Sequence, residues 1–251
     1  MRFIHISEID STNAEARRRA EVGDFGPLWI SSDVQTLGKG RRGREWVSKS
    51  GNLYCTGLYP YDGDLASAAK LSFVAALAVA DSLEQYIDPA LIRIKWPNDV
   101  LVAGQKISGI LLESGTENDQ TWVAVGTGIN LVNHPENTET PATHLLAHID
   151  PEKLQGPEPL FAAKEPVLAT YAARFDHWRS LYLENGFEPI QQAWTARAKG
   201  IGEPVKARLS DKTIEGIALE LDETGALCVQ TKDGCIVKIH AGDVFFPEFH
   251  L

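Results

Sequence analysis

Cysteine is scarce in this sequence. Among 251 residues there are three, Cys55, Cys228 and Cys235. The number is odd and no C-x-x-C pair occurs, which excludes a disulfide framework and a zinc ribbon. We therefore expect three reduced thiols, all buried in strands.

Long apolar runs are also missing. The longest, residues 71–80, includes Ser72 and ends at Asp81, whereas crossing a bilayer takes roughly 20 apolar residues. The first thirteen residues, MRFIHISEIDSTN, contain neither an uninterrupted apolar core nor a small-residue cleavage site, so they do not resemble a signal peptide. We therefore expect a cytoplasmic protein that has no membrane partner.

Positive charge is in deficit. There are 24 Lys and Arg residues against 34 Asp and Glu residues, and the net charge is −10. This balance excludes the overall basic character of a nucleic-acid coat protein. With 43% hydrophobic and 23% charged residues the composition is that of an ordinary globular protein. The length suffices for one large domain, or for a large and a small one.

The positive charge that is present is concentrated in residues 38–44, Gly-Lys-Gly-Arg-Arg-Gly-Arg. These cations repel one another unless an anion is bound among them, and glycines let backbone N–H groups approach that anion closely. The segment therefore predicts a phosphate-containing ligand. Because the sequence offers its charges no fixed partner, we expect the loop to be mobile without ligand.

Two common phosphate motifs almost fit this loop. It reads G-x-G-x-x-G, but only residues 44–52 separate it from the next expected strand, too few for the crossover helix of a dinucleotide-binding fold. As a P-loop it has Arg44 and Glu45 where Lys and Ser or Thr are required. A solvated basic loop and a nucleic-acid patch remain open as alternatives. A small ligand is favoured, because the remainder of the chain is acidic and opposes a polyanion.

Hydrophobic periodicity predicts an alternation of strands and helices over the first 200 residues. Strands are expected at residues 3–6, 29–34, 53–59, 92–96, 107–112 and 122–126, and helices from about residue 14, over 65–86 and across 161–181, where Phe161 shares a face with later apolar residues. Thr12-x-x-Glu15 has the form of a capping box at the first helix. Pro166 predicts a kink in the last one.

The pattern changes near residue 203. Short alternating runs at residues 204–209, 214–221, 227–231 and 236–240 are separated by turn signals. This pattern is typical of a small all-β module. We therefore expect two domains, residues 1–200 and residues 201–251.

Five segments, in this order, resemble the motifs of biotin protein ligases. They are the Gln-x-x-Gly-Lys-Gly-Arg-Arg-Gly-Arg-x-Trp run at residues 35–46, Gly-Asn-Leu-Tyr at 51–54, Lys-Trp-Pro-Asn-Asp at 95–99, Lys-Ile-Ser-Gly-Ile-Leu at 106–111 and Gly-Thr-Gly-Ile-Asn at 126–130. The resemblance implies an α+β fold. Its catalytic domain is a mixed β-sheet with flanking helices, of the class II synthetase and biotin ligase type, and a small C-terminal SH3-like β-barrel follows.

The resemblance also implies a reaction. Biotin and ATP give biotinyl-5′-AMP and pyrophosphate with the help of Mg²⁺, and the biotinyl group then passes to one lysine of a biotin carboxyl carrier protein, as in acetyl-CoA carboxylase. Few residues precede Ser11, where bifunctional members carry a DNA-binding helix-turn-helix, so the sequence is similar to the ligase-only class and no DNA partner is expected. An exposed strand edge would allow a homodimer. The alternatives are a lipoate or octanoate ligase of the same superfamily and a non-enzymatic nucleic-acid adaptor.

Residue roles follow from the same resemblance. Lys106, Arg41 and Lys39 are the expected catalytic cations, because the biotin carboxylate and the α-phosphate repel each other as they react. The expected biotin contacts are Ser11, Thr12, Asn13, Gln35, Lys39, Gly40, Arg41, Trp46, Lys106 and Gly109. The expected ATP or adenylate contacts are Arg41, Arg42, Arg44, Asn98, Asp99, Lys106 and Asn130, and Asp99 is the candidate Mg²⁺ ligand.

Local patterns bear on several of these roles. Lys106 follows Asp99 by seven residues, so a short hairpin would return it to the same end of the sheet. Thr12 is equally well placed to cap its helix, and Arg42 competes with three neighbouring cations for space in the site. Lys39 stands where the family has Arg, which keeps the charge but loses the planar fork. His144 and His148 lack a third partner for zinc.

Overall fold

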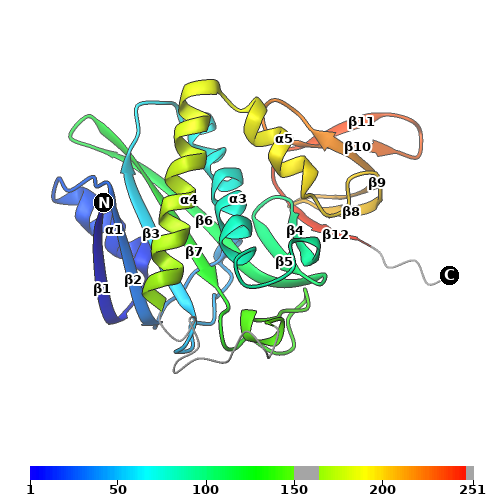
Figure 1. Cartoon of the computed structure of the whole chain (residues 1–251). Coiled ribbons are helices and arrows are strands. Elements are labelled where there is room, and N and C mark those ends of the chain that lie inside the picture. Colours follow the sequence, from blue (N-terminus) through cyan, green and yellow to red (C-terminus); the bar gives the residue numbers. More distant parts are fainter. Residues whose placement is uncertain (150–163, 247–251) are drawn as a thin grey trace.

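Two β-sheets and the helices packed on them make up the fold (Figure 1). The computed structural model describes residues 1–149 and 164–246. The larger sheet has the strand order β1-β2-β3-β7-β6-β5-β4, with β1 and β2 parallel and every other pair antiparallel. Its strands are β1 (Arg2–Ile9), β2 (Leu28–Gln35), β3 (Leu53–Pro60), β4 (Ile92–Lys95), β5 (Asp99–Val102), β6 (Gln105–Glu117) and β7 (Gln120–Ile129).

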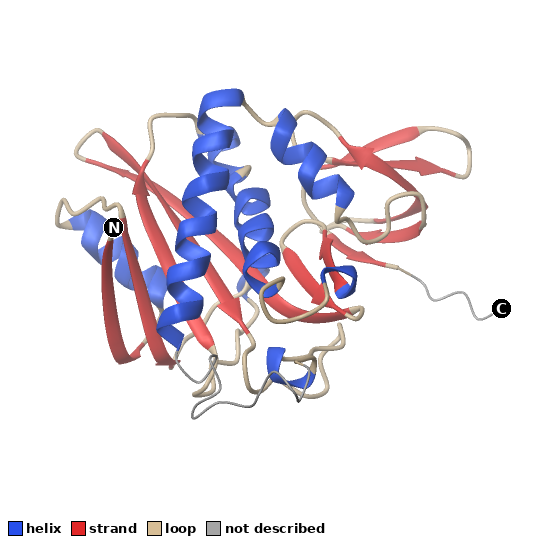
Figure 2. Cartoon of the chain, in the orientation of Figure 1, coloured by secondary structure: helices blue, strands red, loops and turns tan. Residues whose placement is uncertain are grey.

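Helices lie on both faces of this sheet (Figure 2). They are α1 (Thr12–Glu21), α2 (Leu65–Ala69), α3 (Leu71–Leu83), α4 (Lys164–Asn185) and α5 (Glu188–Ala196). Short 3-10 turns occur at η1 (Arg41–Gly43), η2 (Pro89–Leu91) and η3 (Leu145–Ala147). The mixed sheet with flanking helices confirms the expected α+β class.

Alternation along β2 determines which face each side chain enters, as expected for a strand of period two. Leu28 and Ile30 pack with Ala16 and Ala20 of α1. Trp29 points the other way and meets the rings of α4, where Tyr171 lies 5.1 Å from it between ring centroids. The face under α1 holds the smaller hydrophobic cluster, and polar side chains occupy part of it.

The segment Leu65–Leu83, made of α2 and α3, is long and apolar enough to cross a membrane by length and composition. Most of it is buried inside the fold, where α3 packs on β4 and β6 and against α4. An apolar helix that lies between a sheet and a second helix is buried on all sides, which accounts for its composition.

The second sheet contains the C-terminal strands in the order β11-β10-β9-β8-β12, all antiparallel. They are β8 (Pro204–Arg208), β9 (Thr213–Leu221), β10 (Leu227–Thr231), β11 (Ile236–Ile239) and β12 (Asp243–Phe245). The expected all-β module is therefore confirmed. Strands β5 and β12 and helix α5 are additions that periodicity missed, because two are three or four residues long and α5 follows α4 closely.

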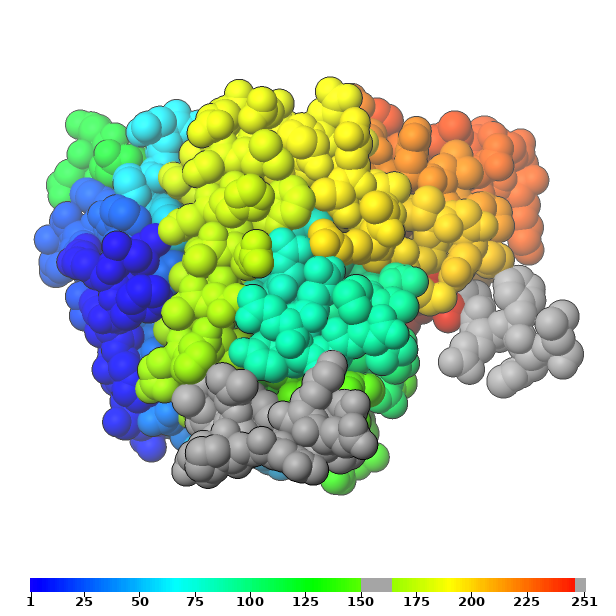
Figure 3. Space-filling model, in the orientation of Figure 1, coloured from blue at the N-terminus to red at the C-terminus, as the bar shows by residue number. Residues whose placement is uncertain are grey.

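The two sheets are joined directly. Trp96 at the end of β4 donates its indole N–H to the carbonyl of Gly225, at 3.0 Å, in the turn before β10. The chain after α5 pairs with the free edge of β4, where the Ile94 N–H donates to Arg197 O at 2.8 Å. Figure 3 shows α5 and the second sheet continuing the surface formed by α3 and α4.

Two expectations about local structure were wrong. Cys55 and Cys228 are buried, but Cys235 is exposed because it closes the tight turn between β10 and β11. The capping box is absent, as described below. The kink expected at Pro166 stays a prediction, because Pro166 is the third described residue of α4 and the preceding residues of that helical run lie outside the described residues. Phe161 lies outside the described residues.

Candidate active site

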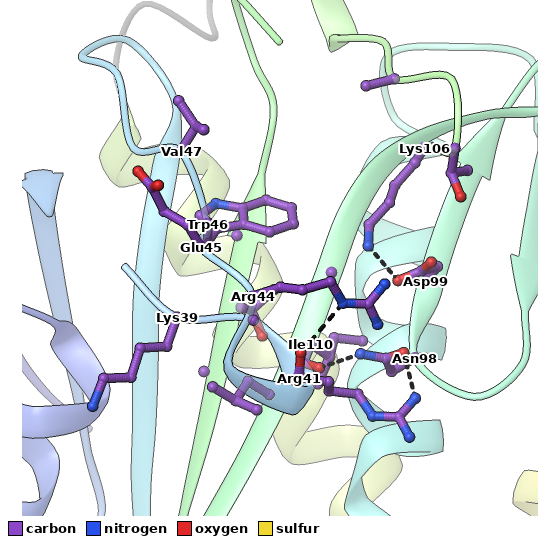
Figure 4. A pocket seen from close by; sticks show the side chains of 18 of the residues that line it. Lys39, Arg41, Arg44, Glu45, Trp46, Val47, Asn98, Asp99, Lys106 and Ile110 are labelled. Atoms are coloured by element: carbon purple, nitrogen blue, oxygen red, sulfur yellow. Dashed lines mark hydrogen bonds and ion pairs between the residues drawn. The ribbon is translucent and has the colours of Figure 1, made fainter. Parts of the chain in front are cut away.

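A cleft of about 290 Å³ opens on the α1 side of the large sheet, between that sheet and β12. Of the residues that the sequence singled out, all but Arg42 line it. They are Ser11, Thr12, Asn13, Gln35, Lys39, Gly40, Arg41, Arg44, Trp46, Asn98, Asp99, Lys106, Gly109 and Asn130. Residues from segments far apart in the chain therefore converge on one site (Figure 4).

The N-terminus of α1 supplies the polar end of the cleft. Ser11 is the N-cap residue and makes no side-chain capping bond, while Thr12 is the first helical residue. The Thr12 hydroxyl and N–H both donate to Gln35 Oε1, at 3.1 and 2.9 Å. The carboxylate of Glu15 pairs with Arg18 and Arg19 instead of reaching back to the helix start. The ion pairs with the two arginines thus take the place of the capping hydrogen bond from the Thr12 N–H to Glu15 that the sequence predicted.

Thr56 of β3, which the sequence analysis did not single out, does not line the cleft but contacts two residues that do. Its hydroxyl lies 2.8 Å from Thr12 Oγ1 and 2.7 Å from Asn13 Oδ1, and it is completely buried. The Asn13 amide also donates to Leu111 O at 3.3 Å. A threonine in a strand is common for its β-propensity alone, so no sequence signal marked this one.

Two glycines form the floor in the middle of the cleft. Gly109 and Gly128 face each other across β6 and β7. The indole of Trp46 lies on them so closely that a Cβ on Gly128 would stand 2.5 Å from the ring and one on Gly109 2.8 Å. Lys106 Nζ lies 5.4 Å from the centre of the same ring. Trp46 therefore lines the cleft, and its role as a biotin contact stays a prediction.

The β5–β6 hairpin places Lys106 as expected. Its Nζ lies 2.6 Å from Asp99 Oδ1. The main chain of Lys106 is fixed as well: its N–H donates to Pro141 O at 2.7 Å, and its carbonyl accepts from Thr143 N at 2.9 Å. Figure 4 shows the lysine side chain pointing into the cleft toward Asp99.

The four cations of the glycine-rich loop, residues 38–44, do not all face the cleft. Arg41 donates to Asn98 Oδ1 at 3.2 Å, and burial lowers the pKa of its guanidinium. Arg44 lines the cleft, whereas Lys39 is exposed at its edge and extends away from Lys106 in Figure 4. Arg42 lies outside the cleft and pairs with Asp243 at 3.2 Å. The loop therefore has a fixed partner, contrary to the premise on which we expected mobility.

Further lining residues come from outside the predicted set. Lys95 of β4 is only 8% exposed, and burial lowers its pKa, since the charged form loses hydration. Its Nζ lies 5.5 Å from the centre of the Phe245 ring. Phe245 and Asp243 belong to β12, so the second sheet contributes one wall of the cleft.

The nearby histidines contact one another and a hydroxyl. His134 Nδ1 and His144 Nδ1 lie 2.7 Å apart, within hydrogen-bond distance. His148 Nε2 lies 2.7 Å from Thr143 Oγ1. Within residues 1–149 and 164–246, no group of three or more His, Cys, Asp and Glu residues is arranged to hold a metal ion.

Comparisons with known proteins agree with this geometry. Residues 26–130 match the model of the biotin/lipoate A/B protein ligase family, and residues 200–246 match the biotin protein ligase C-terminal domain. A biotin--[acetyl-CoA-carboxylase] ligase of Paracoccus denitrificans is 42% identical over 96% of this chain and 99% of its own length. One from Mycobacterium tuberculosis is 33% identical over 95% of this chain and 86% of its own.

A solved structure supports the same conclusion. The biotin protein ligase of Aquifex aeolicus in complex with biotin and ATP superposes with a TM-score of 0.76 at 26% identity, covering 98% of this chain and 99% of that one. The shared motifs, the shared fold and the near-complete overlap with the Paracoccus ligase agree. The chain belongs to the biotin protein ligase family.

Proposed function

We propose that this protein activates biotin with ATP to biotinyl-5′-AMP and pyrophosphate, and then transfers the biotinyl group to a specific lysine of a biotin carboxyl carrier protein. The observation that carries the proposal is the single cleft that joins the polar end of α1 to the cations around Lys106. The names of the relatives favour biotin over the lipoate and octanoate alternatives, and they do not favour a nucleic-acid adaptor.

The first step joins two anions. A biotin carboxylate oxygen must attack the α-phosphorus of ATP while the bond to pyrophosphate breaks. Lys106 and Arg41 both line the cleft, and their charges would offset the repulsion. Asp99 holds Lys106 Nζ at 2.6 Å, which restricts the flexible lysine side chain before substrate arrives. Lys39, at the cleft edge, adds charge and completes the catalytic cations.

The neutral ring system of biotin is assigned to the α1 end. Ser11 and Asn13 offer a hydroxyl and an amide to the ureido group, while Gln35 fixes Thr12. Trp46 and the glycine floor provide the apolar surface beside them. Gly40 and Gly109 line the cleft, and Gly109 lets the Trp46 ring lie against the sheet because it carries no side chain.

The nucleotide is assigned to the opposite end. Arg44, Asn98 and Asn130 line the cleft there, and Asn130 is buried with its amide donating to Thr143 O at 2.9 Å. Mg²⁺ commonly binds one or two carboxylates together with substrate phosphates. Asp99 is suited to this role because its pair with Lys106 uses Oδ1 and leaves the other carboxylate oxygen for the ion. When bound, the ion would neutralise phosphate charge. Arg42 acts indirectly, since it lies outside the cleft.

In the second step the deprotonated amine of the carrier lysine attacks the carbonyl carbon of the adenylate. A C–N bond forms, the bond between the carbonyl carbon and the bridging phosphate oxygen breaks, AMP leaves with the electron pair of that bond, and the amine releases one proton to solvent. The cations that stabilise the developing charge on the phosphate are those used in the first step. The name of the Paracoccus relative supports acetyl-CoA carboxylase as the source of the carrier.

The test is pyrophosphate release from MgATP with biotin, lipoate or octanoate supplied separately. We expect release with biotin alone and a loss of at least about a hundredfold in Lys106→Ala, the scale seen when a charge-stabilising donor is removed. Lys199→Ala is the matched control, because Lys199 pairs with Glu203 and does not line the cleft.

Each other outcome contradicts part of the proposal. Release with lipoate or octanoate instead of biotin would reassign the substrate and keep the activation chemistry. No release with any of the three acids would refute the enzyme itself. Full activity in Lys106→Ala would remove that lysine from the mechanism.

A further inference from the structure

A carboxylate of the second sheet enters the cleft of the first. Asp243, at the start of β12, accepts from Arg44 Nη2 at 2.6 Å and from Arg42 Nη1 at 3.2 Å. Its side chain is 15% exposed, whereas those of Arg42 and Arg44 are 35% and 52% exposed. One largely buried acceptor thus pairs with two more exposed cations of the glycine-rich loop.

Asp243 is itself held firmly. Strand β12 pairs with β8, and the next residue, Val244, is 1% exposed in the main hydrophobic core. Burial alone would raise the pKa of Asp243, but the hydrogen bond from Arg44 and the charges of Arg42 and Arg41 keep it below its ordinary value. The carboxylate is therefore ionised at neutral pH and available to both arginines.

Few contacts within the glycine-rich loop itself fix its position on the sheet. Residues 42–45 are exposed, and Arg42 and Gly43 adopt left-handed backbone with φ of 57° and 73°. The Gly40 N–H and Arg44 N–H hydrogen bonds close turns within the loop rather than onto the sheet. Side-chain ties to the rest of the protein are Arg41 to Asn98 and the two arginines to Asp243.

We propose that Asp243 is a positioning residue for ATP, contributed by the second sheet. By tying Arg42 and Arg44 to β12, it holds Arg41 and Arg44 over the cleft before the nucleotide arrives. Binding then orders less of the loop and loses less conformational entropy. Arg42 serves as the anchor, which explains why it points away from the cleft. This inference rests on the proposed function.

The test measures KM for MgATP, KM for biotin and kcat by pyrophosphate release from the full chain. In Asp243→Ala and in the isosteric Asp243→Asn we expect KM for MgATP to rise about tenfold, with kcat and KM for biotin within about twofold of the parent. Asp243→Glu should recover most of the loss. Glu215→Ala is the matched control, because Glu215 pairs with Lys206 in the same sheet, 3.2 Å apart, outside the cleft.

A double-mutant cycle identifies the route. If Asp243 acts through the anchor, Arg42→Ala should raise KM for MgATP as well, and adding it to Asp243→Ala should cause no further rise. Ligand-free Asp243→Asn should also be cut by trypsin within residues 41–44 faster than the parent and the Glu215→Ala control. This measurement does not depend on the reaction.

Two outcomes would overturn this inference and leave the proposed function intact. In the first, the parent releases pyrophosphate with biotin, but the KM for MgATP of Asp243→Asn is unchanged or lower. In the second, the effects of Arg42→Ala and Asp243→Ala on this KM are additive. A lower KM would mean that the carboxylate competes with phosphate. A parent inactive with biotin would overturn the proposed function and the ATP role of Asp243 with it.

Discussion

The hydroxyl of Thr56 is the most buried polar group of the biotin end. It lies within hydrogen-bond distance of both Thr12 Oγ1 and Asn13 Oδ1, which belong to the first turn of α1. A buried polar group left without its partner costs about 1–3 kcal/mol. Replacing this hydroxyl by a methyl would leave both α1 side chains without one of their contacts.

We therefore expect Thr56→Val to raise KM for biotin roughly tenfold, while KM for MgATP stays unchanged, because the nucleotide end lies across the glycine floor. Steady-state pyrophosphate release at saturating MgATP measures the effect. Thr116→Val is the control, since Thr116 pairs with Thr121 in the exposed β6–β7 hairpin. An equal rise in both KM values would show a general disturbance of the cleft instead.

At the scale of elements, the chain after β7 is held along β6. Residues 141–143 hydrogen-bond to the main chain of Lys106, and His144 and His148 follow them directly in the chain. Burial lowers the pKa of both histidines, and the charges of His134 and His148 lower that of His144 further. The unfolded chain, with an ordinary histidine pKa of about 6.5, thus binds more protons than the folded one.

Stability therefore depends on pH through these histidines. The free energy of unfolding rises with pH through the window below about 6.5 and is lower under acidic conditions. We expect acidification from pH 7.5 to 5.5 to destabilise the protein, and His144→Gln to reduce that loss. Urea unfolding at the two pH values measures it, with His177→Gln on α4 as control. The same loss in parent and His144→Gln would contradict the assignment.

For the whole molecule, the continuous core is the main feature. One hydrophobic cluster includes Trp96 and Ile94 of the large sheet together with Val205, Ala207 and Val229 of the second. The division into residues 1–200 and 201–251 remains a prediction. Shared burial of this kind couples the unfolding of the two sheets.

We therefore expect one urea-induced transition, coincident in far-UV circular dichroism and tryptophan fluorescence. Trp96→Phe, which removes the hydrogen bond to Gly225 O, should lower the free energy of unfolding by about 1–3 kcal/mol and move the midpoint to lower urea without splitting the curve. Two separate transitions would show that the second sheet unfolds independently.

Much of the site could be predicted because its parts are local. The seven-residue separation of Asp99 and Lys106 predicted a hairpin, and the loop cations cluster in the sequence itself. Alternating polarity and β-branched or aromatic content predicted strands that all overlap strands of the structure. Strands β5 and β12 were missed, because three or four residues carry too little periodicity to be recognised reliably.

The sequence by itself determined the family motifs, their order and the need for an anion at residues 38–44. Only the tertiary structure decided which cations face that anion. Arg42 finds Asp243 at a separation of 201 residues, and Thr12 spends its hydroxyl on Gln35 rather than on its own helix. Such pairings depend on how sheets pack and on left-handed loop backbone, and neither leaves a local pattern in the chain.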